Sequence, residues 1–240
     1  MTHHNLPENV ARINPGDSFS FLCHQNIDCF TSCCRQLDLE LTPYDVLRMR
    51  KATGLHSSEL LKRFIIIEHD QRSALPRFYL TMVDDGKASC VFVKSEGCSI
   101  YTHRPGACRT YPLGRATVKS AQQLEAFFVL LKEAHCHGFK EHTLQTIESF
   151  SNSQGLKSYN YFNDLVAEIQ QHEKIRAGMN LTPNHIKSYT TALYDIDTFR
   201  AKLKEGTIAS AAELPENIFK DDEELLRFAI TWVKNVLFGE

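Results

Sequence analysis

The spacing of cysteine constrains this chain more than any other feature of its sequence. Of its 8 cysteines, all but Cys136 lie between Cys23 and Cys108, and the segment from Cys23 to Cys34 holds four of them in the pattern C-x5-C-x3-C-C. The adjacent pair at its end, Cys33 and Cys34, adds little to a hydrophobic interior. Several thiols in one short segment are instead typical of a site for a thiophilic metal, because thiolates are strong ligands for such ions. We therefore interpret the chain first as a metal-binding protein.

Composition excludes several other classes. The 240 residues suffice for one large domain or two small ones. The formal net charge of -2 argues against a large basic surface for nucleic acid or for anionic membranes. No apolar run approaches the roughly 18 residues that span a bilayer, and residues 1–8 show no signal peptide. We therefore expect a cytoplasmic protein with reduced thiols and neither nucleic acid nor membrane as a partner, which makes a set of disulfides the less favoured alternative.

The chain is expected to fall into three parts. Residues 1–20 should form a polar N-terminal arm, residues 21–140 a cysteine-cluster domain, and residues 141–240 a helical region that contains no cysteine and packs on it. We predict an α+β fold, in which a small core of β-hairpins and loops wraps around metal and packs with several α-helices, mainly in the C-terminal half.

Capping residues predict where the helices begin. Thr42 suits the N-cap of a helix, Pro43 suits its first position, Asp45 can hydrogen bond back to the cap, and Gly54 ends it. A second, short helix is predicted from residue 57 or 58. Caps and apolar periodicity predict further helices over residues 161–174, from Thr182-Pro183 onward, and over residues 221–238.

Alternation and turn residues predict a β-hairpin beside the cysteines. Residues 77–83 alternate in polarity, and Asp85-Gly86 is typical of a two-residue type I′ turn, after which residues 88–93 return as the partner strand. This places Cys90 on a strand, while Cys98 follows a turn and Cys108 lies on a bend. Residues 127–131 fit either a third strand or a buried helix.

The number of thiols matches tetrahedral metal coordination. Structural zinc and the common iron–sulfur clusters each take four thiolates, so eight cysteines match two four-ligand sites, or one site with spare thiols. Neighbouring side chains usually point apart, so Cys33 and Cys34 either serve different metals or one of them is a bystander. Ligand type alone leaves zinc, iron and an iron–sulfur cluster open. The candidate metal ligands are Cys23, Cys29, Cys33, Cys34, Cys90, Cys98, Cys108 and Cys136.

Arginines and histidines adjoin the cysteines. Arg35, Arg104 and Arg109 are candidate cofactor-binding residues, because guanidinium groups would offset the negative charge of four thiolates around a metal, or hold an anionic substrate such as a carboxylate. Solvated surface arginines are the alternative. The neighbouring histidines are expected beside the sites or in solvent, because eight thiols already complete two sites; they are His24, His103, His135 and His137.

These residues resemble a known family. Cys29-x3-Cys33-Cys34-Arg35, then Cys90, then Gly97-Cys98-Ser99-Ile100-Tyr101 and Arg104-Pro105-x2-Cys108-Arg109-x-Tyr111-Pro112 are similar to the YkgJ-type CxxCxxCC cysteine-cluster family. The resemblance covers roughly residues 20–140, with Cys136 matching the last of the family's cysteines, and it implies a domain that chelates zinc or iron. The spacing between Cys23 and Cys29 is longer than is usual in the family, which makes Cys23 the weakest match.

Three functions follow as hypotheses. The first is a cytoplasmic protein that chelates zinc or iron, or an iron–sulfur cluster, through clustered thiolates, with metal required for the cysteine half to fold because its loops show no convincing apolar core. The second rests on the resemblance alone, since the family includes proteins similar to flagellin lysine N-methylase: a metal- or cluster-dependent methyltransferase-like enzyme acting on protein lysines. The third is a metal-stabilised module that binds a protein partner. The sequence lacks dinucleotide-binding, P-loop and His-Glu-x-x-His motifs, which disfavours those enzyme classes.

Overall fold

The chain folds into two compact units, each built from two separate segments. The computed structural model describes residues 7–70, 73–119, 124–208 and 214–239. Unit 1 comprises residues 1–37 and 82–160, and unit 2 comprises residues 38–81 and 161–240. Helices alternate with small antiparallel strand groups, which confirms the α+β class. All eight cysteines belong to unit 1, because the segment that leaves it, residues 38–81, contains none.

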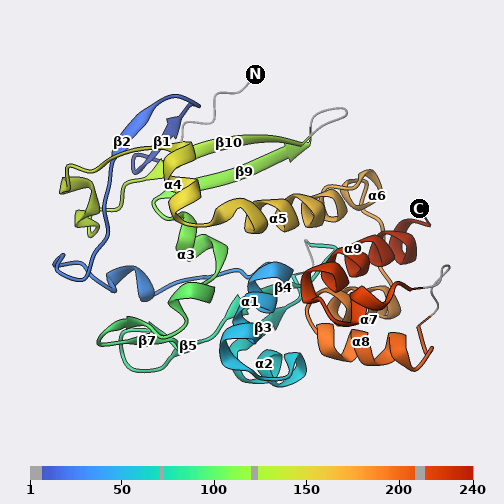
Figure 1. Cartoon of the computed structure of the whole chain (residues 1–240). Coiled ribbons are helices and arrows are strands. Elements are labelled where there is room, and N and C mark those ends of the chain that lie inside the picture. Colours follow the sequence, from blue (N-terminus) through green and yellow to red (C-terminus); the bar gives the residue numbers. More distant parts are fainter. Residues whose placement is uncertain (1–6, 71–72, 120–123, 209–213, 240) are drawn as a thin grey trace. The chain divides into compact units, whose positions relative to one another are not determined.

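Unit 1 is organised by an antiparallel sheet in the order β1-β10-β9 (Figure 1). β10 (Leu124–Leu131) pairs along its length with β9 (Leu113–Lys119), and β1 (Val10–Ile13) adds to its other edge. A second pair joins β2 (Ser18–Ser20) to β11 (Leu144–Thr146), which leads into α4 (Ile147–Ser153). The ambiguous segment at residues 127–131 is therefore a strand, and the segment expected as a polar arm contains two strands.

An aromatic core lies against this sheet. Its buried members come from β1, β2, β9, β10 and α4 and from Phe21, which directly follows β2. Phe21 contacts Phe150 and Phe139 edge to face, with ring centroids 6.0 and 5.3 Å apart. The expectation that the cysteine half lacks an apolar core is therefore wrong. The reason is that the core residues lie far apart in the sequence and only strand pairing unites them. The buried members are Ile13, Phe19, Phe21, Leu113, Leu130 and Phe150.

Short elements carry the cysteines of unit 1. A 3-10 turn spans Ser32–Cys34, β5 (Met82–Val83) pairs with β6 (Ser89–Cys90), and β7 (Val93–Lys94) pairs with β8 (Gly97–Cys98). Further 3-10 turns, Tyr101–His103 and His137–Lys140, lie next to α3 (Gly106–Thr110) and after Cys136, respectively. Cys90 and Cys98 are on strands, whereas Cys108 lies within α3 and not on a simple bend.

The predicted two-residue hairpin turn is wrong. The last pair before the turn is Val83 with Ser89, so five residues connect the strands. The side chain of Asp85 explains the longer loop, since its Oδ1 accepts the backbone N–H groups of Lys87 and Ser89 at 2.9 and 3.2 Å. The first half of the predicted strand, β4 (Arg77–Leu80), instead pairs with β3 (Ile65–Glu68) in unit 2.

Unit 2 is mainly helical, and its caps confirm the local predictions. Thr42 and Asp45 form a capping box at the start of α1 (Pro43–Thr53), which ends at Gly54 with a φ of 66°. α2 (Ser57–Phe64), α7 (Pro183–Leu193) and α9 (Asp222–Phe238) also begin where predicted. α5 (Leu156–Gln170) starts and ends earlier than predicted. The remaining helical elements are α6 (Glu173–Arg176), α8 (Ile196–Lys204) and a 3-10 turn at Glu216–Phe219.

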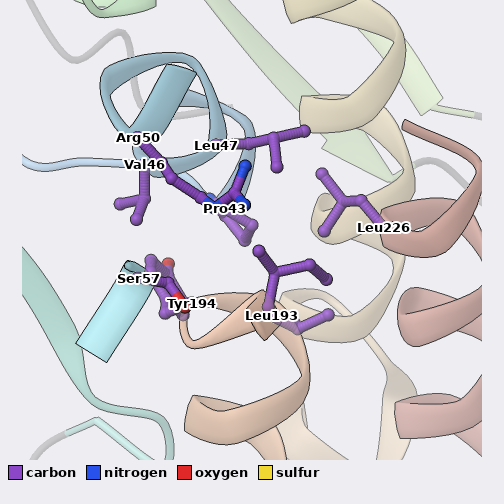
Figure 2. Close-up of a pocket in the computed structure, with 9 residues that line it drawn as sticks. Pro43, Val46, Leu47, Arg50, Ser57, Leu193, Tyr194 and Leu226 are labelled. Carbon is purple, nitrogen blue, oxygen red and sulfur yellow. The ribbon is translucent and has the colours of Figure 1, made fainter. Parts of the chain in front are cut away.

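Apolar packing and one ion-pair network hold unit 2 together. Figure 2 shows side chains of α1, such as Val46 and Leu47, lining a small pocket with Leu193 and with Leu226 of α9. At its margin, Arg50 binds both carboxylate oxygens of the buried Asp197, at 2.6 and 2.7 Å. The pocket has no room for a water molecule and is a packing seam. Within the described ranges, no helix combines the length and hydrophobicity that a membrane crossing requires.

Candidate metal centre

The eight cysteines all lie in described parts of unit 1, and none forms a disulfide. Cys23, Cys33 and Cys108 are exposed, and the other five are half-buried. Across the described ranges of the chain, no three Cys, His, Asp or Glu side chains converge closely enough to hold an ion. A site of three or more of these thiols would therefore require side-chain rotations.

Backbone hydrogen bonds bring Cys23, Cys29 and Cys136 together from opposite ends of unit 1. The N–H of Leu22 donates to the carbonyl of Gly138 at 3.1 Å, so Cys23 lies beside the turn that follows Cys136. The N–H of His137 donates to Sγ of Cys29 at 3.2 Å. These contacts place three of the predicted ligands in one neighbourhood.

Gly138 allows this close approach of the two segments. A Cβ atom at this position would lie 2.5 Å from the Phe21 ring and 3.1 Å from the carbonyl oxygen of Leu22. Both distances are shorter than van der Waals contact, so any side chain would push the Cys23 segment away from the Cys136 turn. Sequence reasoning missed this residue, although a glycine directly after His135-Cys136-His137 is a signal of close packing beside a ligand.

A second neighbourhood forms around Cys90. An isolated antiparallel bridge joins Arg35 to Ser89, and the N–H of Gln36 donates to the carbonyl of Ala88 at 2.9 Å. The register of such a bridge places Cys34 alongside Cys90. On the next short hairpin, Cys98 pairs with Val93, and the N–H of Ser99 donates to the carbonyl of Phe92 at 2.9 Å. Cys34, Cys90 and Cys98 are therefore held close to one another.

Arginine hydrogen bonds fix α3, the helix of Cys108. The buried Arg109 donates through Nε to the carbonyl of Arg104 at 3.1 Å, through Nη1 to that of Gln154 at 2.8 Å, and through Nη2 to that of Thr102. Its guanidinium lies over the Tyr159 ring, 4.9 Å from the centroid. Arg109 thus joins the backbone of residues 102–104, just before α3, to that of Gln154.

Arg104 and Arg35 are the cations beside the thiols. Arg104 is buried, donates to the carbonyl of Tyr101 at 2.7 Å, and interacts electrostatically with Cys98 and Cys108. Burial lowers the pKa of Arg104. Arg35 donates to the carbonyl of Thr31 at 3.3 Å and has a buried Nε with no acceptor in the described part of the chain. Both positive charges favour the thiolate form of nearby cysteines.

Backbone donors also favour thiolates at the second neighbourhood. Burial raises the pKa of the Cys90 thiol, while hydrogen bonds from the backbone of Phe92 and Val93 oppose that rise. Cys98 shows the same balance between burial and a hydrogen bond from the backbone of Ile100. N–H groups two and three residues after a cysteine cap a thiolate sulfur, because the negative charge makes it a better acceptor.

The adjacent thiols of Cys33 and Cys34 differ in the direction of their pKa shifts. A hydrogen bond between the two thiols lowers the pKa of Cys33 to about 7 and raises that of Cys34. Elsewhere, burial, aided by the neighbouring thiols of Cys33, Cys29 and Cys136, raises the pKa of Cys23 to about 11. The cysteines therefore form an electrostatically coupled group in which charge on one thiol opposes charge on the next, and a divalent cation would relieve that repulsion.

Most neighbouring histidines face carboxylates. His24 Nε2 lies 3.5 Å from Glu141, and His135 Nε2 lies 3.6 Å from Glu133. Tyr111 belongs to the motif that resembles the family, and its pKa is raised by burial and by the adjacent Cys136 and Glu133. Its buried hydroxyl therefore lies beside a candidate ligand, a contact that the sequence did not indicate.

The donor set fits a thiophilic metal. Soft sulfur ligands are gathered in one unit, backbone N–H groups point at three of the sulfurs, and two arginines supply positive charge. Zinc and iron both accept such ligands. The roles of the eight cysteines as ligands and of the three arginines as cofactor-binding residues stay predictions.

Comparison with known families agrees with this donor chemistry. Residues 22–137 match the family model described as "CxxCxxCC: Putative zinc- or iron-chelating domain". Comparisons with curated proteins and with solved structures gave no significant match. The matched segment begins just before Cys23 and ends just after Cys136, so it contains every cysteine of the chain. Residues 22–137, slightly less than half of the chain, therefore match the family that the sequence resembles.

Proposed function

We propose that this protein binds zinc or iron through the clustered thiolates of its CxxCxxCC domain. The observation that carries the proposal is that cysteine-bearing segments from distant parts of the chain lie side by side, with Cys29 accepting a hydrogen bond from the backbone of His137, 108 residues away. Such a hydrogen bond stabilises the deprotonated sulfur that a metal requires. The ion would supply the positive charge that the coupled thiols lack.

The finer features of the proposal follow from the same site. We place the metal-binding domain at residues 21–140 and assign the eight cysteines as its ligands. Arg35 and Arg104 offset thiolate charge, while Arg109 holds the segment that carries Cys108. A cytoplasmic location fits, because thiols stay reduced there and the structure contains no disulfide among its cysteines.

Elemental analysis of protein purified without oxygen tests this function. We expect zinc or iron bound to the full-length chain, with acid-labile sulfide present only if the bound species is an iron–sulfur cluster. The variant Cys29→Ser should lower both the metal content and the melting temperature, because it removes a ligand and the acceptor for His137.

A matched control separates ligation from surface chemistry. His24→Ala removes an imidazole next to Cys23 in the sequence. Because this imidazole faces Glu141, we expect the metal content to stay at the wild-type level. Wild-type protein without zinc or iron, or Cys29→Ser with full metal and an unchanged melting curve, would refute the proposed function.

A further inference from the structure

We propose that β3 (Ile65–Glu68) is an interaction strand, to which a second copy of this chain adds its own β3 in antiparallel orientation to form a two-fold dimer. The strand lies in unit 2, whose residues include no cysteine, so the inference is independent of the metal function proposed above. Three features of the strand carry it: an open backbone edge, exposed isoleucines, and opposite charges at its two ends.

β3 is the outer strand of its sheet. β4 pairs with β3 along one edge, and along its other edge it bonds to residues 39–41. There the N–H of Leu41 donates to the carbonyl of Phe78 at 2.7 Å, and the N–H of Leu80 donates to that of Leu39 at 2.9 Å. β4 therefore has neighbours along both edges, whereas β3, within the ranges that the structure describes, has a strand neighbour along one edge only.

The register of the ladder shows which backbone groups of β3 point outward. The N–H of Thr81 donates to the carbonyl of Phe64 at 2.9 Å, so the alternation of an antiparallel ladder directs the polar backbone groups of Ile65 and Ile67 away from β4. The N–H of Ile65 is already used, since it donates to the carbonyl of Leu61 at the end of α2. The open edge thus offers the N–H of Ile67 and the carbonyls of Ile65 and Ile67, for which the described residues supply no partner.

The side chains of this edge are apolar and exposed. Ile66 is 49% exposed and Ile67 is 39% exposed. Soluble proteins protect open edge strands with a lysine, a proline or a bulge, and Ile65-Ile66-Ile67 contains none of these. β-Branched residues also favour the strand conformation. The edge is therefore suited to the addition of another strand.

Symmetry and charge identify the added strand as a second β3. With the two-fold axis at Ile66, the N–H of Ile67 in each copy can donate to the carbonyl of Ile65 in the other, and isoleucine faces isoleucine at each position. The exposed Arg63 precedes the strand and the exposed Glu68 ends it. Antiparallel pairing brings the basic end of one copy to the acidic end of the other, twice per dimer.

Sedimentation of the full-length protein tests this pairing. A four-residue strand gives an interface below about 1,200 Å², which is typical of reversible association. We expect the mean mass to rise with protein concentration from 27.4 kDa toward twice that value.

A proline variant tests the backbone contact. Ile67→Pro removes the outward N–H and no hydrogen bond of the β3–β4 ladder. It should raise the dissociation constant of the dimer about 30-fold, because both hydrogen bonds between the copies are lost. The control is Leu144→Thr at a 68% exposed position of unit 1, which should associate like wild type.

Exchanging the charges tests the antiparallel orientation. Arg63→Glu and Glu68→Lys should each weaken the dimer about tenfold, since symmetry repeats either change at both ends of the paired strands. The double variant restores opposite charges between the copies and should recover the association of wild type.

Hydrogen exchange on wild-type protein avoids the risk that Ile67→Pro fails to fold. Peptides that contain residues 65–69 should become more protected as the protein concentration rises, while peptides that contain β11 exchange at a constant rate. A wild-type protein that stays monomeric without such protection, a dimer that Ile67→Pro leaves intact, or a double charge variant weaker than both single variants would overturn the proposal. So would a dimer that dissociates when metal is chelated, because its contact would then be made by the thiols. None of these outcomes bears on whether unit 1 binds metal.

Discussion

Gly138→Ala should push the Cys23 segment away from the Cys136 turn without removing any candidate ligand. The added Cβ would lie 2.5 Å from the Phe21 ring and 3.1 Å from the carbonyl oxygen of Leu22. Relieving this clash costs about 1–3 kcal/mol, as for other overpacked interiors. Moving the Leu22 backbone also breaks its hydrogen bond to Gly138, now 3.1 Å long, which adds about 1 kcal/mol. We expect unit 1 to lose about 2–4 kcal/mol of unfolding free energy.

Two measurements test this prediction. Hydrogen exchange with mass spectrometry gives the unfolding free energy of peptides from each unit separately, and elemental analysis gives the metal content. We expect Gly138→Ala to lower the stability of unit 1 peptides and to bind less metal than wild type.

Gly114→Ala is the matched control for this prediction. Its Cβ would also clash, at 2.7 Å from Cγ2 of Val129, but the clash is with the β9–β10 ladder and not with a cysteine-bearing segment. We expect a smaller loss of stability and full metal content. Gly138→Ala with wild-type metal content and a stability within about 0.5 kcal/mol of wild type would refute the packing argument, since surface-like substitutions fall in that range. Equal metal loss in Gly114→Ala would show that general destabilisation is the cause.

Further predictions concern the supports of each unit. Asp197→Asn should destabilise unit 2 by about 2–4 kcal/mol and leave the metal content unchanged. The loss is smaller than for a fully buried ion pair, because Arg50 is partly exposed. Urea titration followed through Trp232 fluorescence measures this change in stability. Burial raises the pKa of Asp197, but hydrogen bonds from Arg50 and Ser57 outweigh it, so the net pKa lies below 3.8. Its contribution to stability is therefore complete above about pH 4 and is lost as the pH falls through the lowered pKa; identical acid profiles for wild type and Asp197→Asn would contradict this. Arg109→Met should destabilise unit 1 by about 3 kcal/mol, because three carbonyls lose a hydrogen bond from a buried guanidinium and that of Arg104 keeps only the Tyr159 hydroxyl as donor among the described residues. A melting temperature equal to wild type would show that water replaces the guanidinium. Thr42→Ala should cost about 1 kcal/mol by removing the cap of α1, measured in the same urea titration. No loss is expected for Lys51→Ala at an exposed position in the last turn of the same helix.

Local chemistry explains which features were predictable. The starts of α1, α7 and α9 follow from side chains that hydrogen bond to N–H groups two or three residues ahead. The sequence therefore predicts these helix starts from Thr42, Thr182 and Asp221. The hairpin turn was predicted less well, because Asp85 bonds to two N–H groups of its own loop and lengthens it. Strands β1 and β2 escaped prediction because short polar strands gain their stability from partners across the chain.

The amino-acid sequence by itself determined the chemistry of the candidate site. Eight thiols, with arginines beside several of them, are candidate ligands for thiophilic metals whatever the fold. The tertiary structure decided which thiols are neighbours, since Cys29 meets the turn after Cys136 only when strands from both ends of unit 1 pair and the aromatic core closes. It also decided that residues 38–81 leave the cysteine unit for the helical one. Contacts of this kind depend on burial summed over distant segments, which no local pattern of residues records.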